Sequence, residues 1–315
     1  MRFSFIEPML LQSETTLPEG WSYELKLDGY RALAGRVGGA VCLRSRNDND
    51  FTGTYSTITA ALKSLPDDTV VDGEVVALDE TGKPSFNLLQ HAKSSQVRIV
   101  YYVFDLLILG GKDVMGLPLA ERRKLLETKV LPQLGEPVRY SGALDAPINE
   151  LIATVKQYGF EGLVAKNPKS TYEPGKRSGS WKKLRINRGQ EFVIGGYTIG
   201  GNGFDALIFG YYDETGLRFA AKTRNGFTPA SRSSLIKKMT PLVTTECPFL
   251  GLPEKRAGRW GQGITAEKMK DCVWLRPVLV GQFEFVEWTP DAHLRHSTFV
   301  GLREDKDARD VVREP

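Results

Sequence analysis

Hydrophobic and polar residues alternate over residues 23–47, a pattern that predicts antiparallel strands near the start of the chain. The Gly38–Gly39 pair within this stretch is typical of a hairpin turn. The segment 69–78 is apolar on both sides of Asp72–Gly73, and we expect a turn at that pair. Longer apolar runs predict further strands over residues 97–109 and 161–168.

Apolar residues with a helical spacing recur between these strands, and prolines mark some of the ends. Pro118 lies near the start of one helical segment, and Pro132 lies near its end. The predicted helices cover residues 57–65, 86–93, 118–134 and 149–160. This half of the chain therefore has an α+β character.

From Gln190 onward the pattern changes to short alternating strands that glycine turns interrupt. Regular short strands of this kind predict a small barrel such as an OB-fold. We therefore expect two domains, residues 1–188 and residues 189–315, with a boundary near Arg188 and Gly189.

A chain of 315 residues with 41% hydrophobic and 25% charged residues has an ordinary globular composition and can build two cores. Its net charge of +4 does not by itself indicate nucleic acid. The three cysteines lack metal-ligand or redox spacing, and three histidines leave little scope for a histidine metal site. We see no secretory signal or membrane span and expect a cytoplasmic protein.

Lys26 lies between Leu25 and Leu27 in the first predicted strand, shortly before Arg31. Most lysines on a strand face are surface residues, and this short string alone favours that interpretation. A lysine amine becomes a nucleophile where an apolar setting or nearby cations disfavour its charged form. Lys26 is therefore a candidate nucleophile on a rigid element.

Five further strands carry charged residues in apolar surroundings, which is costly unless the charges are paired. Each strand alone is best explained by a structural ion pair. Together they predict one polar pocket with carboxylates, cations and an aromatic face, which suits a nucleotide and its metal ion. The residues are Arg44 and Arg46, Glu74, Phe104 and Asp105, Glu161 and Lys166, and Lys183 and Arg185.

The order of these motifs resembles the covalent nucleotidyltransferases and, among them, the ATP-dependent DNA ligases. The motifs are ELKLDGYR, RSRN, DGEVV, YYVFDLL, EGLVAK and WKKLRI, followed by FVEWTPDAHLRHSTFVGLREDKD. Seven motifs in one order are a far more specific signal than any one of them. The likeness is closest to the ligase module of bacterial end-joining ligases.

This resemblance implies an α+β nucleotidyltransferase domain followed by an all-β OB-fold domain, and a three-step reaction with ATP. Lys26 would attack the α-phosphate to give lysyl-AMP, and AMP would pass to the 5′-phosphate of a DNA nick. The 3′-hydroxyl would then seal the backbone and release AMP. Such displacements at phosphorus depend on positioning and charge neutralisation, for which Mg²⁺ or Mn²⁺ would be bound.

The resemblance also assigns roles to the residues of the pocket. Glu24 would read the adenine amino group, and Phe104 would stack on adenine. Glu161 would bind metal, and Glu74 would contact ribose or metal. The expected contacts to ribose and phosphates come from Arg31, Arg46, Lys166, Lys183 and Arg185. The family usually has a lysine where Arg185 stands, which leaves the role of Arg185 open.

A last motif near the C-terminus carries Arg303, Asp305 and Lys306. Charged turns of this kind are usually solvated surface. The resemblance instead implies a catalytic motif that swings over the pocket and orients the pyrophosphate during the first step. Such a movement requires a mobile joint, which we expect at Arg188–Gly189.

Basic residues are frequent between Lys166 and Arg188, and these predict contacts with DNA phosphates. Further cations of the second domain are Lys222, Arg224, Arg232, Lys237 and Lys238. The expected partner is nicked double-stranded DNA, bound by its shape with little sequence preference. We also consider a bacterial Ku-type end-binding protein as a partner, and we expect a monomer that associates with the nucleoid during repair and does not bind membranes.

Two alternatives remain open at this stage. An RNA ligase or a GTP-using mRNA capping enzyme shares the lysine motif, although the EWTPDAHLRH run favours the DNA ligases. A non-catalytic DNA-binding module with a degenerate pocket is the second alternative. It is disfavoured because each expected catalytic position holds a usable residue.

Overall fold

The computed structural model describes residues 4–90, 97–186, 189–200, 203–255 and 263–314. The chain divides into two compact units, Met1–Asn187 and Arg188–Glu314. The joint expected at Arg188–Gly189 lies partly outside the described residues. Among the described residues, no helix combines the length and the hydrophobicity needed to cross a bilayer.

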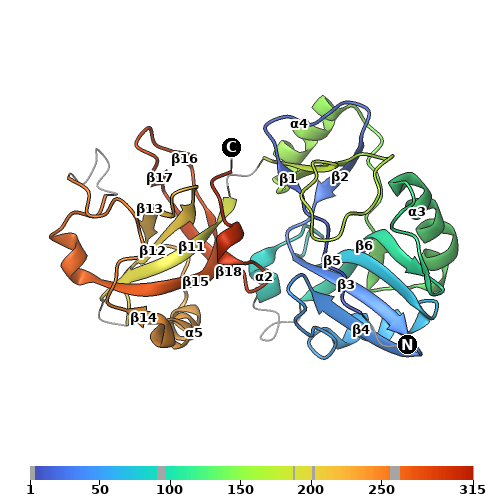
Figure 1. The fold of residues 1–315 in the computed structure, drawn as a ribbon, viewed down its shortest axis with the longest axis horizontal. Helices are drawn as coiled ribbons and strands as arrows, with labels where there is room; N and C mark the ends of the chain where they lie inside the picture. Colours follow the sequence, from blue (N-terminus) through green and yellow to red (C-terminus); the bar gives the residue numbers. More distant parts are fainter. Residues whose placement is uncertain (1–3, 91–96, 187–188, 201–202, 256–262, 315) are drawn as a thin grey trace. The chain divides into compact units, whose positions relative to one another are not determined.

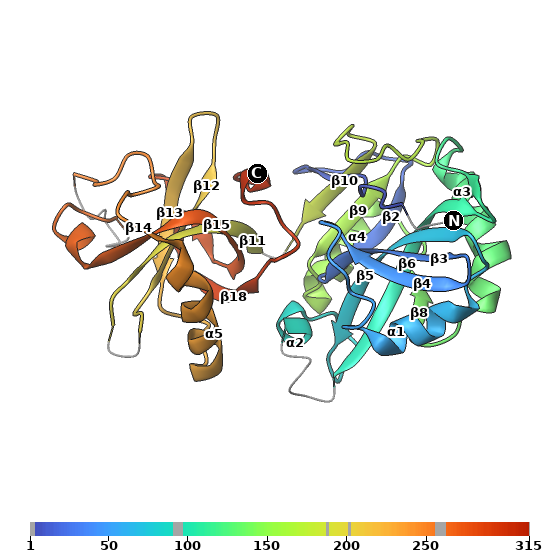
Figure 2. The same ribbon diagram turned by 60° about the horizontal axis from the view of Figure 1, so that its bottom comes forward.

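Two sheets form the frame of the first unit. The larger sheet has the strand order β4-β3-β5-β6-β7, with β8 paired to β6, and the smaller sheet has the order β1-β10-β9-β2. Both views show β3, β4, β5 and β6 side by side (Figures 1 and 2). The larger sheet comprises β3 (Tyr30–Val37), β4 (Ala40–Ser45), β5 (Thr69–Leu78), β6 (Arg98–Leu109), β7 (Lys112–Asp113) and β8 (Val138–Tyr140). The smaller sheet comprises β1 (Gln12–Ser13), β2 (Ser22–Lys26), β9 (Gly162–Lys166) and β10 (Trp181–Arg185).

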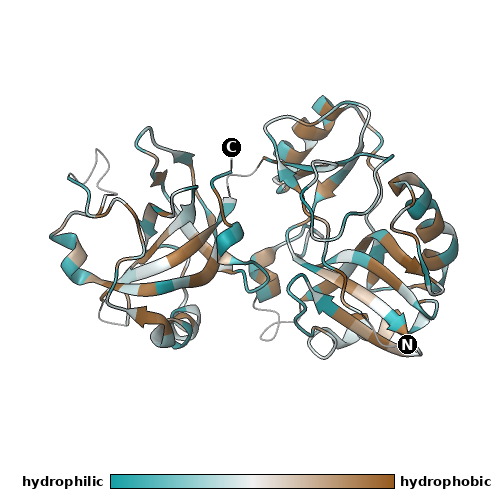
Figure 3. Ribbon diagram, viewed as in Figure 1, coloured by the Kyte–Doolittle hydropathy of each residue, from teal (hydrophilic) through white to brown (hydrophobic). Residues whose placement is uncertain are grey.

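Helices of the first unit cover these sheets with their apolar faces. Helix α3 packs against β6, and α4 packs against β9 through Leu151 and Val155. Hydrophobic and hydrophilic residues alternate along α3, as expected for a helix with one buried side (Figure 3). The helices are α1 (Ser56–Ala61), α2 (Phe86–Gln90), α3 (Leu119–Leu125) and α4 (Ile148–Tyr158). Residues 91–93 of the second predicted helix lie outside the described residues.

An aromatic and aliphatic cluster joins residues of the two sheets. Trp181 of β10 and Leu33 of β3 are fully buried, and Phe104 of β6 is 7% exposed. Trp181 packs edge-on against Phe104 and Tyr172, with ring centroids 6.3 and 5.6 Å apart. Each such ring removes a large apolar area from water, so this cluster fixes the sheets at a defined separation.

The predicted turn at Asp72–Gly73 is wrong, because β5 runs through this pair without a break. Gly73 is instead required by packing. A Cβ atom there would lie 2.5 Å from the Tyr102 carbonyl oxygen and 2.6 Å from the Tyr101 ring. The Tyr101 hydroxyl crosses the strand to donate a hydrogen bond to the Ala32 carbonyl at 2.8 Å. The Asp-Gly signal therefore marks a close approach of neighbouring side chains.

The strand order also corrects the pairing suggested by the sequence pattern. Strands β3 and β4 form the expected hairpin around Gly38–Gly39. Strand β2, which precedes them, leaves this sheet and pairs with β9. The residues of the first motif are thus divided between two sheets, with Lys26 at the end of β2 and Arg31 on β3.

The second unit is a strongly β structure built around two long paired strands, β11 and β15. Phe192, Phe209 and Phe283 fill its centre. The rings of Phe209 and Phe283 are stacked, with their centroids 3.8 Å apart. Its six-stranded sheet has the order β13-β12-β11-β15-β14, with β18 paired to β15, and β16 pairs with β17. The strands are β11 (Gly189–Thr198), β12 (Leu207–Tyr212), β13 (Leu217–Thr223), β14 (Val243–Thr244), β15 (Cys272–Glu284), β16 (Glu287–Trp288), β17 (Leu294–Arg295) and β18 (Thr298–Leu302).

The expectation of an all-β second domain missed one helix, α5 (Pro229–Met239). Thr228 caps this helix, and its side chain accepts a hydrogen bond from the Ser231 N–H at 3.1 Å. A threonine followed by a proline at the first helical position is a recognised start signal. The helix was therefore detectable from the sequence, although the glycine-rich strands around it dominated the pattern.

Candidate active site

Strand register brings the expected site residues of the smaller sheet onto one face. Side chains two residues apart on a strand share a face, so Glu24 and Lys26 lie together on β2. Glu24 lies opposite Val164 and Lys26 opposite Gly162, which places Lys166 on the same face. Residues 181, 183 and 185 of β10 pair with 166, 164 and 162 in turn. One surface of the sheet therefore carries Glu24, Lys26, Lys166, Lys183 and Arg185.

Lys26 forms an ion pair with Glu161, the residue directly before β9. Its Nζ lies 2.6 Å from Glu161 Oε1, and both side chains are 13% exposed. Arg185 Nε lies 3.3 Å from the same oxygen. The second oxygen, Oε2, is buried and has no hydrogen-bond partner within the described part of the chain. A buried carboxylate oxygen without a partner is costly, so it marks a position suited to a cation or a ligand donor.

Glu24 is the centre of a second, deeper charge cluster. It is 2% exposed, and its two oxygens accept hydrogen bonds from different cations. Lys166 Nζ donates to Oε2 at 3.0 Å, and Arg123 donates to Oε1. Burial is the main reason that the pKa of the Lys166 ammonium is lowered to about 8. The negative charge of Glu24 raises this pKa, and the positive charge of Arg123 lowers it further. Sequence analysis missed Arg123, whose partner lies 99 positions away.

The Lys166 ammonium also lies over two aromatic rings. Its Nζ is 4.0 Å from the centroid of the Phe104 ring and 4.2 Å from that of Trp181. Contacts of this kind stabilise a cation by the negative potential of the ring face. Phe104 is the extra residue of a β-bulge, because β6 shifts register against β5 between the pairs Asp105–Asp72 and Val103–Gly73. Bulges redirect side chains, often beside active sites.

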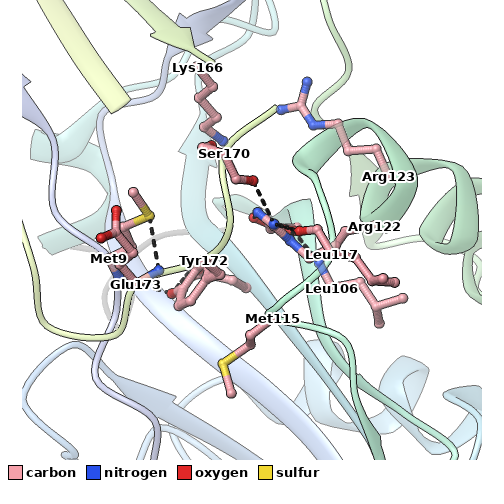
Figure 4. Close-up of polar contacts among 12 residues, drawn as sticks. Met9, Leu106, Met115, Leu117, Arg122, Arg123, Lys166, Ser170, Tyr172 and Glu173 are labelled. Carbon is pink, nitrogen blue, oxygen red and sulfur yellow. Dashed lines mark hydrogen bonds and ion pairs between the residues drawn. The ribbon is translucent and has the colours of Figure 1, made fainter. Parts of the chain in front are cut away.

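Arg31 and Asp72 form a bidentate ion pair. Its Nε and Nη2 each donate to a different carboxylate oxygen at 2.6 Å, and the Asp72 side chain is fully buried. Burial disfavours the charge of Arg31, but the adjacent Asp72 outweighs this effect and raises its pKa. The Tyr172 hydroxyl donates to the same Asp72 carboxylate at 2.7 Å and accepts from the Met9 N–H. Figure 4 shows Tyr172 beside Met9 and Glu173.

The other residues of the first unit that were predicted to line the site lie near the pair formed by Arg31 and Asp72. Glu74 is half-buried on β5, opposite Arg31 on one side and Tyr102 on the other. Arg46 follows the end of β4, and its N–H donates to the Arg31 carbonyl at 3.1 Å. The prediction that Arg44 and Arg46 share a strand face is therefore wrong. Arg44 instead pairs with Asp48 and Asp50 at the edge of the sheet.

Asp105 lies in a fully buried ion pair with Arg122, away from the nucleotide role that the charged strands suggested. Arg122 Nε and Nη2 each donate to Asp105 at 2.8 Å, and both side chains are 0% exposed. Arg122 Nη1 also reaches the carbonyls of Leu117 and Ser170, at 2.6 and 3.0 Å. Figure 4 shows this guanidinium enclosed by Leu106, Leu117 and Ser170. Its surroundings are those of a structural clamp.

In the second unit, the last predicted motif forms its own ion pairs. Arg303 Nε and Nη2 donate to the two oxygens of Asp305 at 2.9 and 2.8 Å, and both residues are buried. Lys306 Nζ lies 3.6 Å from Glu191 Oε1. The alternative of a solvated charged turn does not describe Arg303 and Asp305, because their side chains are 7% and 1% exposed.

Several of the basic residues predicted to contact DNA are buried or form ion pairs within the protein. Lys166 is buried, and Lys182 pairs with Glu14 at 2.8 Å. In the second unit Arg224 pairs with Asp205. Among the described residues of these basic stretches, the cations that lie exposed on the surface are Lys169, Lys176, Arg177, Arg224, Lys237 and Lys238. These exposed cations can reach a phosphate backbone, and their contact with DNA stays a prediction.

The site fits a metal ion held partly by its substrate. No group of three or more His, Cys, Asp or Glu side chains in the described ranges is arranged to hold a metal. Glu161 nevertheless offers a buried oxygen without a partner. Mg²⁺ is commonly bound by one or two carboxylates together with substrate phosphates and water, and this arrangement agrees with that chemistry.

Two curled sheets that enclose a lysine–carboxylate pair, followed by an OB-fold, define the class as a nucleotidyltransferase with an OB-fold domain. Two family sequence models match the chain. The "ATP dependent DNA ligase domain" covers residues 8–185, and the "ATP dependent DNA ligase C terminal region" covers residues 200–306. The chain therefore belongs to the ATP-dependent DNA ligases, which confirms the resemblance and excludes the capping-enzyme alternative.

Relatives of known function agree with this family. The chain is 36% identical to the multifunctional non-homologous end joining DNA repair protein LigD of Mycobacterium tuberculosis, over 99% of this chain and 40% of LigD. It is 34% identical to DNA ligase C of the same organism, over 96% of this chain and 91% of that protein. A solved structure of mycobacterial DNA ligase D complexed with ATP and MES is 35% identical, covers 99% of this chain and all of that chain, and has a TM-score of 0.69. The chain spans about two fifths of the length of LigD.

Proposed function

We propose that this ligase seals nicks that carry a 5′-phosphate and a 3′-hydroxyl, and that Lys26 is the residue that carries AMP. The main support is the Lys26–Glu161 pair, 2.6 Å long and mostly shielded from water, at the end of a strand that fixes the amine. Gly29, three residues on, packs directly against β5, because a Cβ there would lie 2.1 Å from the Val75 carbonyl oxygen. The nucleophile is thus held on a tightly packed element.

In the first step the Lys26 amine forms a bond to the α-phosphorus of ATP, and the bond to pyrophosphate breaks. The amine must first be unprotonated and separated from Glu161, because a bound proton occupies its lone pair. Glu24, Phe104, Lys166, Arg31 and Arg46 would contact the nucleotide, with Lys183 and Arg185 near the phosphates. AMP then passes to the 5′-phosphate of the nick, and the 3′-hydroxyl displaces it.

Glu161 would hold a divalent metal, with Glu74 as a second candidate. When bound, Mg²⁺ or Mn²⁺ would neutralise phosphate charge and favour the unprotonated amine. The buried oxygen of Glu161 that lacks a partner supports this assignment. The competing attraction between Glu161 and the metal would also weaken the ion pair that holds Lys26.

Labelling of the protein with radioactive ATP tests the assignment of Lys26. The wild-type chain should retain label through denaturation, and Lys26→Ala should retain none. Lys63→Ala, on the surface of the same unit, serves as the matched control and should label normally. Label on the Lys26→Ala protein would remove this residue from the role, and label from GTP alone would argue against an ATP-dependent ligase.

We further propose that the chain works in DNA end joining, as the name of its relative LigD states for that protein. An end-binding protein of the Ku type would then recruit it, and a monomer would suffice for sealing. Stimulation of double-strand-end ligation by Ku, without stimulation of nick sealing, is the expected result. Equal activity with and without Ku on both substrates would contradict this proposal.

A further inference from the structure

Arg123 of α3 is a buried cation that belongs to none of the sequence motifs, yet it contacts the strand that carries Lys26. Its Nη1 donates to Ser22 Oγ at 2.8 Å, and its Nη2 donates to Glu24 Oε1. Ser22, Glu24 and Lys26 share one face of β2, so Arg123 holds that face from the helix side. Figure 4 shows Arg122 and Arg123 diverging from α3, with Arg123 extending toward the side on which Lys166 lies.

Burying an arginine at this position costs free energy that a purely structural role does not explain. Arg123 is 7% exposed, and its Nε is buried without a hydrogen-bond partner in the described residues. An unpaired buried donor costs stability, and buried ion pairs often contribute less than apolar residues of similar volume. Glu24 does not need Arg123 for neutralisation, because Lys166 already binds its other oxygen at 3.0 Å.

We propose that Arg123 is a positioning residue that orients Glu24 for the adenine amino group and thereby sets the base specificity of adenylation. This inference rests on the function proposed above. A carboxylate can accept the amino N–H of adenine, whereas guanine presents a carbonyl acceptor at the same place. With one oxygen held by Arg123 and the other by Lys166, the carboxylate plane cannot rotate, and its remaining lone pairs point in fixed directions.

Arg123 also acts on Lys166 through Glu24. With Arg123 in place, Glu24 is shared between two cations, and Lys166 has only part of its counter-charge. Without Arg123, Lys166 would keep the whole carboxylate, and its pKa would rise because a nearby positive charge is lost. Loss of Arg123 should therefore change both the base specificity and the pH above which the rate of adenylation falls.

Self-adenylation of the whole chain, measured against ATP and GTP concentration and against pH, tests this proposal. Arg123→Met should raise the KM for ATP about tenfold, with a smaller effect on kcat, and lower the preference for ATP over GTP by a similar factor. The alkaline limb of its pH profile should move upward. Lys124→Met removes an exposed charge from the same helix and should leave all three quantities unchanged.

A folded Arg123→Met protein with wild-type nucleotide preference and pH profile would overturn the inference. Arg123→Lys carries the same test if the methionine variant does not fold. One ammonium cannot reproduce the fork that spans Ser22 and Glu24, so the KM should still rise several-fold, whereas the retained charge should keep the pH profile. An unchanged KM in Arg123→Lys would also overturn it. If the wild-type chain forms no adduct at all, it is the proposed function that fails.

Discussion

For Lys26 to act as the proposed nucleophile, its amine must lose its contact with Glu161. The two atoms lie 2.6 Å apart and are mostly shielded from water, so the pair is stronger than one on the surface. Arg185 shares the same carboxylate oxygen at 3.3 Å. We expect arginine at this position to keep Glu161 neutralised after Lys26 has moved, which would give a physical role to the residue that departs from the usual family pattern.

The Lys166 ammonium should set the alkaline limit of adenylation. A cation with a pKa of about 8 binds phosphate below that pH and loses this ability above it. We therefore expect the rate of self-adenylation to fall as the pH rises past about 8. Lys166→Arg remains charged throughout this range, so its decline should begin at higher pH, even if its rate is lower. An unchanged decline in Lys166→Arg would assign the limit to another group.

Asp72 is expected to contribute mainly to stability. Asp72→Asn would leave the buried guanidinium of Arg31 without its counter-charge and weaken the hydrogen bond from Tyr172. We expect a loss of about 3 kcal/mol in the free energy of unfolding, measured by urea titration. Asp113→Asn removes a charge from an exposed residue of the same unit and should have little effect. Equal losses in the two variants would contradict this account.

Strands β5 and β6 place most of the aromatic and acidic residues around the cluster. Their ladder shifts register twice, and one of the shifts inserts Phe104 as an extra residue. That insertion turns Phe104 toward Lys166 and Arg31, with the Arg31 guanidinium carbon 4.8 Å from the ring centroid. The ring position therefore depends on how two strands pair, and a local pattern of apolar residues does not reveal it.

Gly73 is the position in β5 that should be most sensitive to a small side chain. Gly73→Ala would place a methyl group against the Tyr101 ring and the Tyr102 carbonyl oxygen, neither of which can move freely. We expect a loss of about 1–3 kcal/mol, measured by urea unfolding. Gly116→Ala adds the same methyl group where no atom lies within 4 Å, so its stability should be nearly unchanged. A neutral Gly73→Ala would show that β5 can shift away from β6.

The clamp formed by Arg122 links helix α3 to a strand, to the residues just before the helix and to one distant loop. It joins α3 to Asp105 on β6 and to the carbonyls of Leu117 and Ser170. Because the Arg122 side chain is fully buried and binds Asp105 through two hydrogen bonds, it can fix α3 against the sheet. The neighbouring Arg123 depends on that fixed helix for its reach to β2.

The predicted catalytic residues are distributed over the two units of the molecule. The lysine and its surrounding cations belong to the first unit, and Arg303, Asp305 and Lys306 belong to the second. In the second unit Arg303 is held by Asp305, within a pair that is almost fully buried. For Arg303 to contact pyrophosphate, this fork would have to open or turn as one group.

Arg303 should matter more for the first step than for the last. Arg303→Ala is expected to lower self-adenylation by at least tenfold more than it lowers sealing of DNA that is already adenylated. Arg309→Ala removes an exposed cation six residues further along and should change neither step. Circular dichroism should confirm that both variants are folded. Equal losses in the two assays would argue against a role confined to the first step.

The class of this protein and most of its elements were predictable from sequence, for a local reason. Strands, helices and the motif order depend on residues close together in the chain, such as the hairpin at Gly38–Gly39 and the helix that begins after Pro118. The prediction failed where local signals have two meanings. Asp72–Gly73 has the composition of a turn, yet it lies within a strand because Tyr101 packs over it.

By itself, the sequence determined that the chain is an α+β nucleotidyltransferase with an OB-fold, and which charged residues had to find partners. Only the tertiary structure decided those partners. Lys166 binds Glu24 across 142 positions, and Arg31 binds Asp72 across 41. Such pairings follow from strand register and from which sheet each strand joins, and these are settled by packing between segments far apart in the chain. The contact between Arg123 and Glu24 is the clearest case, because no local sequence pattern around either residue predicts it.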